Sequence, residues 1–284
     1  MVTRIVCAQT APVVGDLAGN RARSAAAVRD AAALGAHVIV LPELVTSGYV
    51  FASAAEAASV AVTPADPVFA AWAGAAGGAV VVGGFCERGA DGRLYNSAAV
   101  VDRGEVVAVY RKTHLWDTEK DVFTPGGRGA PVVATTAGPI GVLICYDLEF
   151  PEMTRALALA GARLVAAPVN WPLVDRPAGE RPPEAVIAMA AARVNRMFVA
   201  CCDRTGDERG VRWTGGTTIV GADGWPLAEA GASGFAVAGV DLADAGDKTA
   251  SPRNDLLRDR RPDLYRGSGT SRNAMNAGNV FRDA

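Results

Sequence analysis

The feature that most constrains the fold is an alternation between short, continuously apolar runs and helical segments. Near the start, RIVCAQ (4–9) and HVIVLPE (37–43) flank NRARSAAAVRDAAALG (20–35), whose apolar residues recur at helical spacing and which ends on a glycine. Strands that lack polar alternation are typical of sheets buried on both faces. Residues 4–43 are therefore predicted to form a β-α-β unit in an α/β protein.

The same alternation continues along most of the chain. Further strands are expected at 79–87, 95–102, 105–112, 139–147, 163–170, 197–203, 217–221 and 235–241, and helices at 151–161 and 183–195. The turn residues Arg103 and Gly104 predict a hairpin between the second and third of these strands. Because no repeat or linker interrupts the pattern, we expect a single domain over 1–284 with its core at about 4–241. The polar tail, about 243–284, is expected to be loosely ordered or to contact a partner subunit.

Charge and cysteine usage exclude several classes of protein. A net charge of −2 argues against a nucleic-acid partner. Five cysteines at irregular spacings contain no C-x-x-C pair, so we expect neither disulfides nor a zinc site. The start MVTRIVCAQTAP does not resemble a signal peptide, and no apolar run reaches the ~18 residues of a membrane span. We therefore expect a cytoplasmic protein that does not bind membranes.

Motifs for several common chemistries are missing from the sequence. It contains no G-x-S-x-G, no P-loop and no G-x-G-x-x-G, and only two histidines. These observations argue against a serine hydrolase of the α/β-hydrolase type, a nucleotide-dependent enzyme and a zinc enzyme.

Three reactive side chains stand where predicted strands end. Cys145 closes a buried strand and precedes a turn, Glu43 closes HVIVLPE, and Lys112 closes EVVAVYRK. Taken singly, each has an ordinary interpretation: a buried thiol, a solvated strand end and a surface lysine. Together at one sheet edge they would supply a nucleophile, a general base and an oxyanion stabiliser for acyl transfer. His114 is a further candidate for the base, in a Cys–His pair.

The stretches LPELVTSGY, YRKTHLW and GVLICYDLEFPE, in this order, resemble the Glu, Lys and Cys segments of the nitrilase superfamily of carbon–nitrogen hydrolases. The resemblance covers about residues 4–241. It implies a four-layer α-β-β-α sandwich whose protomers usually pair through the faces around the nucleophile helix, as a homodimer or a larger homo-oligomer. It also implies that the polar tail wraps the partner, and that the protein uses no metal and no organic cofactor.

The resemblance implies a role for each of four residues. Cys145 would attack the amide carbonyl and form a thioester, while Glu43 would take the thiol proton and later activate water. Lys112, with the backbone N–H after the cysteine, would hold the oxyanion. Glu119, in HLWDTEKDVFTPGG, would be the second glutamate of the family, which orients the lysine or the substrate amide; otherwise it is a surface carboxylate.

The sequence departs from the family pattern at two positions. Val194 stands where a glutamate is usual, so a structural or dimer contact of that glutamate is lost or rebuilt. Glu149 stands where branches that act on amides of dicarboxylic acids often have arginine, which argues against an anionic acyl group.

Five residues are expected to line the substrate pocket: Tyr49, Trp116, Tyr146, Asn170 and Trp171. Mainly aromatic walls without an anion clamp favour a small neutral acyl group. Tyr146-Asp147 after the cysteine is the amidase-like variant, whereas nitrile hydrolysers usually have Trp-Glu. The sequence thus predicts an amidase for small aliphatic amides that releases ammonia and a carboxylic acid. The alternatives are an N-carbamoyl amidohydrolase, an ω-amidase, a nitrilase, a non-catalytic binding protein and a redox-sensing thiol.

Overall fold

The computed structural model describes residues 1–265, which belong to two compact units, Met1–Asp247 and Lys248–Ala284. The second unit contains a short antiparallel pair, β15 (Thr249–Ser251) and β16 (Asn254–Asp255), and a helix, α7 (Pro262–Tyr265). The expectation of a partner-contacting tail falls in part on residues 266–284, which lie outside the described residues. The remaining description concerns the first unit.

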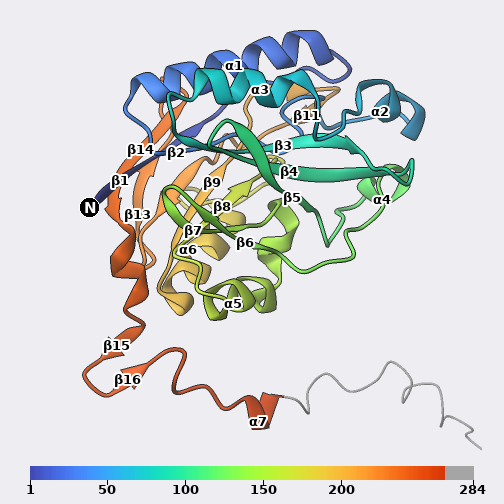
Figure 1. Ribbon diagram of the computed structural model, residues 1–284. Helices are drawn as coiled ribbons and strands as arrows, with labels where there is room; N and C mark the ends of the chain where they lie inside the picture. The colour runs from blue at the N-terminus through green and yellow to red at the C-terminus, as the bar shows by residue number, and fades with distance from the viewer. Residues whose placement is uncertain (266–284) are drawn as a thin grey trace, which may run out of the picture. The chain divides into compact units, whose positions relative to one another are not determined.

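One six-stranded sheet, the first sheet, has the order β14-β1-β2-β3-β4-β5 (Figure 1). Its strands are β1 (Val2–Ala8), β2 (Val38–Val40), β3 (Val80–Arg88), β4 (Leu94–Asp102), β5 (Glu105–Arg111) and β14 (Phe235–Asp241). Strands β1, β2 and β3 are parallel to one another, and the other neighbours pair antiparallel. The predicted β4–β5 hairpin is present, and both turn residues, Arg103 and Gly104, have positive φ, as a tight hairpin turn requires.

A second six-stranded sheet has the order β13-β12-β9-β8-β7-β6. Its strands are β6 (Val132–Thr135), β7 (Gly138–Val142), β8 (Leu164–Pro168), β9 (Phe198–Cys202), β12 (Thr218–Val220) and β13 (Pro226–Glu229). Strands β7, β8 and β9 are parallel. Each sheet therefore has a parallel centre flanked by antiparallel strands, which agrees with the continuously apolar sequence of the central strands.

The two sheets pack face to face, and helices cover their outer faces (Figure 1). Helices α1 (Leu17–Ala33) and α3 (Pro67–Ala75) cover the first sheet, and α5 (Pro151–Leu159) and α6 (Pro183–Asn195) cover the second. Between the sheets, fully buried aliphatic side chains such as Ile5 and Val142 meet, and each contributes about 1.5–3 kcal/mol. The predicted four-layer α-β-β-α sandwich is confirmed.

Several shorter elements connect the layers. They are α2 (Ala54–Val60), α4 (Glu119–Val122), the 3₁₀ helices η1 (Cys145–Glu149) and η2 (Leu242–Gly246), and the hairpin of β10 (Asp207–Glu208) and β11 (Val211–Arg212). Helices α2 and α3 were not predicted from the sequence, although Ser53 and Asp66 cap their N-termini with side-chain oxygens. The strand expected at 139–147 ends earlier, at Val142, because the chain turns into η1.

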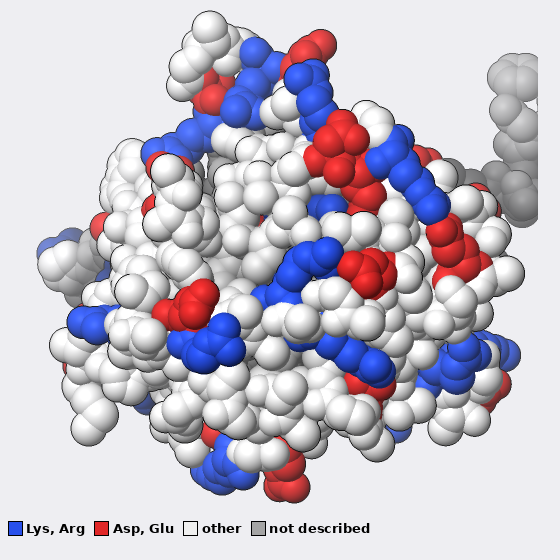
Figure 2. Space-filling model, turned by 90° about the horizontal axis from the view of Figure 1, so that it is seen from above, with Lys and Arg blue, Asp and Glu red and all other residues white. Residues whose placement is uncertain are grey.

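The face over α1 and α3 carries interleaved basic and acidic side chains rather than a continuous basic surface (Figure 2). Exposed ion pairs such as Arg23–Asp16 account for part of this pattern. Within residues 1–265, no helix is long and apolar enough to span a membrane.

Candidate active site

Glu43 is held at the end of β2 by close packing of the backbone. Leu44, the next residue, has φ 49°, so the chain bends sharply just after the glutamate. Gly84 on β3 allows this bend, because a Cβ there would lie 2.4 Å from Leu44 N and 2.5 Å from Glu43 Cα. Asn170 Nδ2 donates to Glu43 O at 3.0 Å. The carboxylate is thereby fixed in a fully buried position.

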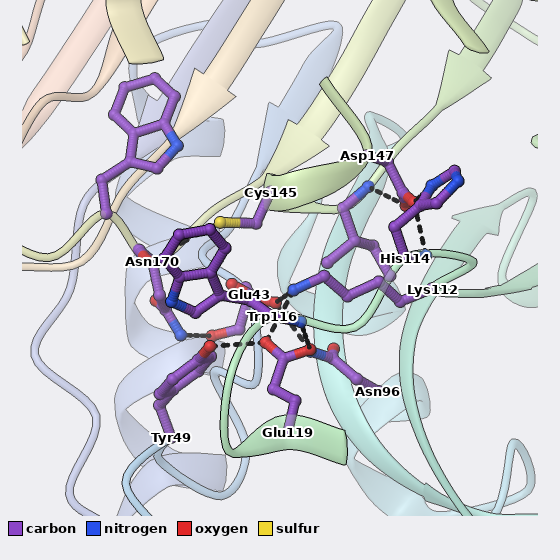
Figure 3. A network of polar contacts seen from close by, with 12 residues as sticks. Glu43, Tyr49, Asn96, Lys112, His114, Trp116, Glu119, Cys145, Asp147 and Asn170 are labelled. Carbon is purple, nitrogen blue, oxygen red and sulfur yellow. Dashed lines mark hydrogen bonds and ion pairs between the residues drawn. The ribbon is translucent and has the colours of Figure 1, made fainter. Parts of the chain in front are cut away.

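Lys112 joins two buried carboxylates (Figure 3). The residue follows β5, its side chain is fully buried, and its Nζ lies 2.7 Å from Glu43 Oε1 and 2.7 Å from Glu119 Oε1. Glu119 opens α4 and also accepts a 2.5 Å hydrogen bond from Tyr49 OH. The sequence left open whether Glu119 is a surface carboxylate; the structure places it in the interior, against the lysine.

The two oxygens of Glu43 have different surroundings. Oε1 accepts from Lys112 Nζ and, at 2.7 Å, from Asn96 Nδ2 on β4. Oε2 is buried and has no hydrogen-bond partner among the described residues. A buried acceptor without a donor is costly, so Oε2 is the oxygen suited to receive a proton.

Burial and neighbouring charges shift the pKa values of Glu43 and Lys112, with different consequences for their charge at neutral pH. Burial raises the pKa of Glu43 to about 7, although the Lys112 ammonium opposes this. Burial also disfavours a charged Lys112, but the carboxylates of Glu119 and Glu43 outweigh it and raise the pKa of Lys112 above its ordinary value. The lysine is therefore a permanent cation at neutral pH, whereas Glu43 is poised to exchange a proton.

Cys145 lies beside this cluster at the start of η1 (Figure 3). Its φ of 45° is rare for a residue with a side chain, and such backbone strain is typical of functional sites. The thiol is half-buried and donates to Asn170 O at 3.7 Å. Burial, and then the carboxylate of Glu43, raise the pKa of the Cys145 thiol well above its ordinary value. The side chain is therefore a neutral thiol at neutral pH.

His114 is not the partner of the cysteine. Its Nδ1 lies 2.9 Å from Asp147 Oδ1, which also accepts from His114 N at 3.0 Å. The ring stacks on Phe150 with 3.6 Å between centroids. The other Asp147 oxygen accepts from Ile144 N at 3.2 Å, directly before Cys145. His114 and Asp147 thus brace the turn that carries the thiol.

A cavity of about 120 Å³ opens onto Cys145. All five expected pocket residues, Tyr49, Trp116, Tyr146, Asn170 and Trp171, line it, together with Glu149, Pro172, Val174 and Glu184. Trp116 packs edge-on against Tyr146, with 4.8 Å between ring centroids. The cavity is small, mainly aromatic, and acidic at two positions.

Sequence reasoning missed Asn96 and Glu184. Asn96 is the second residue of YNSAAVVD, where a fully buried strand carries an amide, and that position could have marked it as a candidate. Glu184 lies in the first turn of α6, far along the chain, and nothing local in the sequence associates it with the cysteine. Within the part of the chain that the structure describes, no group of three or more His, Cys, Asp or Glu could hold a metal ion.

The fold is that of a known class of hydrolases. Residues 4–248 match the carbon–nitrogen hydrolase family, and the chain belongs to this family. It is 35% identical over 266 residues to an (R)-stereoselective amidase of a Pseudomonas species, covering 91% of each chain. It is 32% identical over 270 residues to a nitrilase of Pyrococcus abyssi, covering 93% of this chain and 99% of the relative.

Among solved structures, an amidase of the nitrilase superfamily from Nesterenkonia AN1 superimposes with a TM-score of 0.78 at 30% identity. The match covers 94% of this chain and 97% of the other. Another structure of that amidase shows acrylamide added to the active-site cysteine. The protein is accordingly a hydrolase of carbon–nitrogen bonds.

Proposed function

We propose that the protein is an amidase that hydrolyses small aliphatic amides to a carboxylic acid and ammonia, with Cys145 as nucleophile, Glu43 as general base and Lys112 as oxyanion stabiliser. The observation that supports this most directly is the buried lysine at 2.7 Å from two carboxylates, beside a neutral thiol. A surface lysine or an inert core thiol requires no such arrangement.

In the first half of the proposed reaction, Cys145 Sγ attacks the amide carbonyl carbon. The thiol proton passes to Glu43, whose Oε2 has no other partner. The Lys112 ammonium stabilises the negative charge that develops on the carbonyl oxygen. When the tetrahedral intermediate collapses, the C–N bond breaks, Glu43 returns the proton to the nitrogen, and ammonia leaves a thioester on Cys145.

In the second half, water replaces the amine. Glu43, again a carboxylate, removes a proton from the water as its oxygen attacks the thioester carbon. The C–S bond breaks, the proton returns to sulfur, and the carboxylic acid departs. Glu119 does not exchange a proton in this scheme: it holds Lys112 and, through Tyr49 OH, one wall of the cavity.

The cavity supports a small acyl group without negative charge. Its volume of about 120 Å³ is far below the ~300–1,000 Å³ of pockets for drug-sized ligands. Glu149 and Glu184 line it, and no lysine or arginine among residues 1–265 does. Burial, followed by Glu184, raises the pKa of Glu149, so the two carboxylates already disfavour each other's charge. An anionic substrate would add a third negative charge.

We also propose that the protein works in the cytoplasm as a homodimer or larger homo-oligomer that covers the outer face of α5 and α6. Several apolar side chains on these helices are exposed: Leu159 (49%), Val186 (50%) and Val194 (44%). Val194, at the position where the family often has glutamate, adds to this apolar surface. The five cysteines are unpaired, which fits a reducing compartment.

A substrate panel tests the proposed function. Ammonia release is measured with acetamide, hexanamide, glutaramate, an N-carbamoyl amine and acetonitrile, with Cys145→Ala as control. Turnover of the simple amides is expected, with glutaramate disfavoured. If the wild-type protein hydrolyses none of the amides, the proposal of an amidase is refuted. Preference for glutaramate, the carbamoyl compound or the nitrile would instead indicate an ω-amidase, a carbamoyl amidohydrolase or a nitrilase.

A further inference from the structure

A second cluster of buried charges lies outside the catalytic residues discussed so far. Asp203 and Arg204 directly follow β9, and Glu208 ends β10 four residues later. Their exposed fractions are 0%, 1% and 5%. Ionised groups are rarely buried unless they are paired, and keeping them so is expensive. The position of this cluster therefore needs an explanation.

Glu208 holds the segment that leads from Glu43 to the cavity. Its Oε2 accepts hydrogen bonds from Tyr49 N at 2.9 Å and from Val50 N at 2.7 Å. Gly48 brings the chain close enough for these bonds, since a Cβ there would lie 2.8 Å from Glu208 Oε1. The two bonds fix the backbone of Tyr49, whose side chain lines the cavity and donates to Glu119.

Arg204 in turn holds Glu208. Its Nη1 lies 2.9 Å from Glu208 Oε1, and its Nη2 donates to Pro12 O at 2.7 Å. The guanidinium also lies over the Trp213 ring, 4.7 Å from the centroid, and that ring packs edge-on against Tyr49 at 5.4 Å. The arginine thus supports Tyr49 along two routes, one ionic and one aromatic.

Asp203 ties a second cavity residue to the same segment. Its Oδ1 accepts from Trp171 N at 2.9 Å and from Arg204 N at 2.8 Å, while Oδ2 accepts from Gly216 N at 2.8 Å. Trp171 lines the cavity and follows Asn170, which contacts both Cys145 and Glu43. Two walls of the cavity therefore depend on consecutive residues at the end of β9.

We propose that Arg204 and Glu208 are positioning residues for the amidase reaction, which hold Tyr49, and through it Glu119 and Lys112, in the geometry that catalysis needs. Neither residue lines the cavity that opens onto Cys145, so neither is a catalytic residue. The inference rests on the proposed function. Its physical basis is that misplacing catalytic groups by about 1 Å can cost on the order of 100-fold in rate.

The test compares two ion pairs that hold the same segment. Glu208→Gln keeps the shape of the side chain but removes the charge that Arg204 faces. The matched control is Glu56→Gln, because Glu56 accepts from Ala52 N and pairs with Arg209, which donates to Val50 O, at a more exposed site. Kinetics are normalised to the concentration of folded protein, measured by circular dichroism, so that unfolded molecules do not count.

For Glu208→Gln, kcat/KM for acetamide is expected to fall at least tenfold, and hydrogen exchange at the amides of Tyr49 and Val50 to become at least tenfold faster. Glu56→Gln should change both quantities less than twofold. If Glu208→Gln does not fold, the double variant Arg204→Gln, Glu208→Gln, which removes both charges of this ion pair, takes its place and should change both quantities in the same direction.

Unchanged kinetics or unchanged exchange in the folded variant would overturn the inference, and so would an equal effect of Glu56→Gln. Failure of the proposed function is distinguishable, since it shows as no amide turnover by the wild-type protein. In that case the exchange measurement alone decides whether Glu208 holds the segment.

Discussion

The acid limb of the pH–activity profile is the most direct test of the charge cluster around Lys112. Burial raises the pKa of Glu43 to about 7, with Lys112 opposing and Glu119 adding to the rise. If Glu43 acts as a base, kcat/KM should increase tenfold per pH unit below about pH 7 and then level off. Glu119→Gln removes a negative charge near Glu43, so the pKa of Glu43, and with it the acid limb, should move to lower pH.

The size of the shift follows from the geometry. Oε1 of Glu43 and Oε1 of Glu119 both lie 2.7 Å from Lys112 Nζ, so they are close to each other. At roughly 5 Å and an effective dielectric constant of about 20, two like charges repel by about 3 kcal/mol. That energy corresponds to about 2 pKa units. At pH 5 the wild-type protein should keep about 1% of its plateau activity, and the variant roughly half of its own, lower plateau.

The assay is ammonia release from acetamide between pH 4.5 and 9, with each profile scaled to its own plateau. Tyr49→Phe is the control, because it removes a hydrogen bond to Glu119 without changing charge, and its acid limb should stay in place. Asn96→Ala should move the limb to higher pH, since the Asn96 hydrogen bond lowers the pKa of Glu43. An acid limb that stays still or rises in Glu119→Gln would refute the assignment of Glu43 as the titrating base.

Three further outcomes are expected. Cys145→Ala should lower kcat by at least about 10⁴-fold without changing the thermal unfolding midpoint by more than a few degrees; substantial ammonia release by this variant would exclude the thioester. Glu149→Gln should raise kcat/KM for glutaramate several-fold relative to hexanamide, and an unchanged ratio would mean that this exposed carboxylate does not select substrates. Gly84→Ala should lower kcat/KM on the order of 100-fold, because the new Cβ must displace the backbone of Glu43; wild-type activity would show that the bend tolerates it.

The sequence predicted the sheets well because their central strands are continuously apolar. Apolar strands such as HVIVLPE and RLVAAPVN are expected to be buried on both faces. In the structure, the first lies at the centre of the first sheet and the second at the centre of the second sheet. Helices α2 and α3 were missed because they are short and alanine-rich, with little contrast between their faces. The predicted end of β7 was wrong because the apolar sequence continues through Leu143 and Ile144, whereas the backbone already turns toward Cys145 after Val142.

The candidate site could be predicted from the sequence only in part, and for a different reason. Glu43, Lys112 and Cys145 are polar residues directly after apolar strands, a local signal that survives in the sequence. Asn96 and Glu208 act across the fold, 53 and 159 residues from the groups they bond, Glu43 and Tyr49. Such contacts depend on register and on backbone direction, which short-range patterns do not encode.

The balance of charge in the cluster explains why Cys145, in the proposed mechanism, needs a separate base. With both glutamates ionised, two carboxylates and one ammonium leave a net charge of −1 around Lys112. A thiolate at Cys145 would add a second negative charge in a buried place, which agrees with the raised pKa of this thiol. In the proposed mechanism, the attacking thiol therefore has to release its proton as the new bond forms, and Glu43 Oε2, a buried acceptor without a partner among the described residues, can take it. The arrangement keeps the net charge of the site constant during attack, because the negative charge moves from Glu43 to the carbonyl oxygen, where Lys112 can stabilise it.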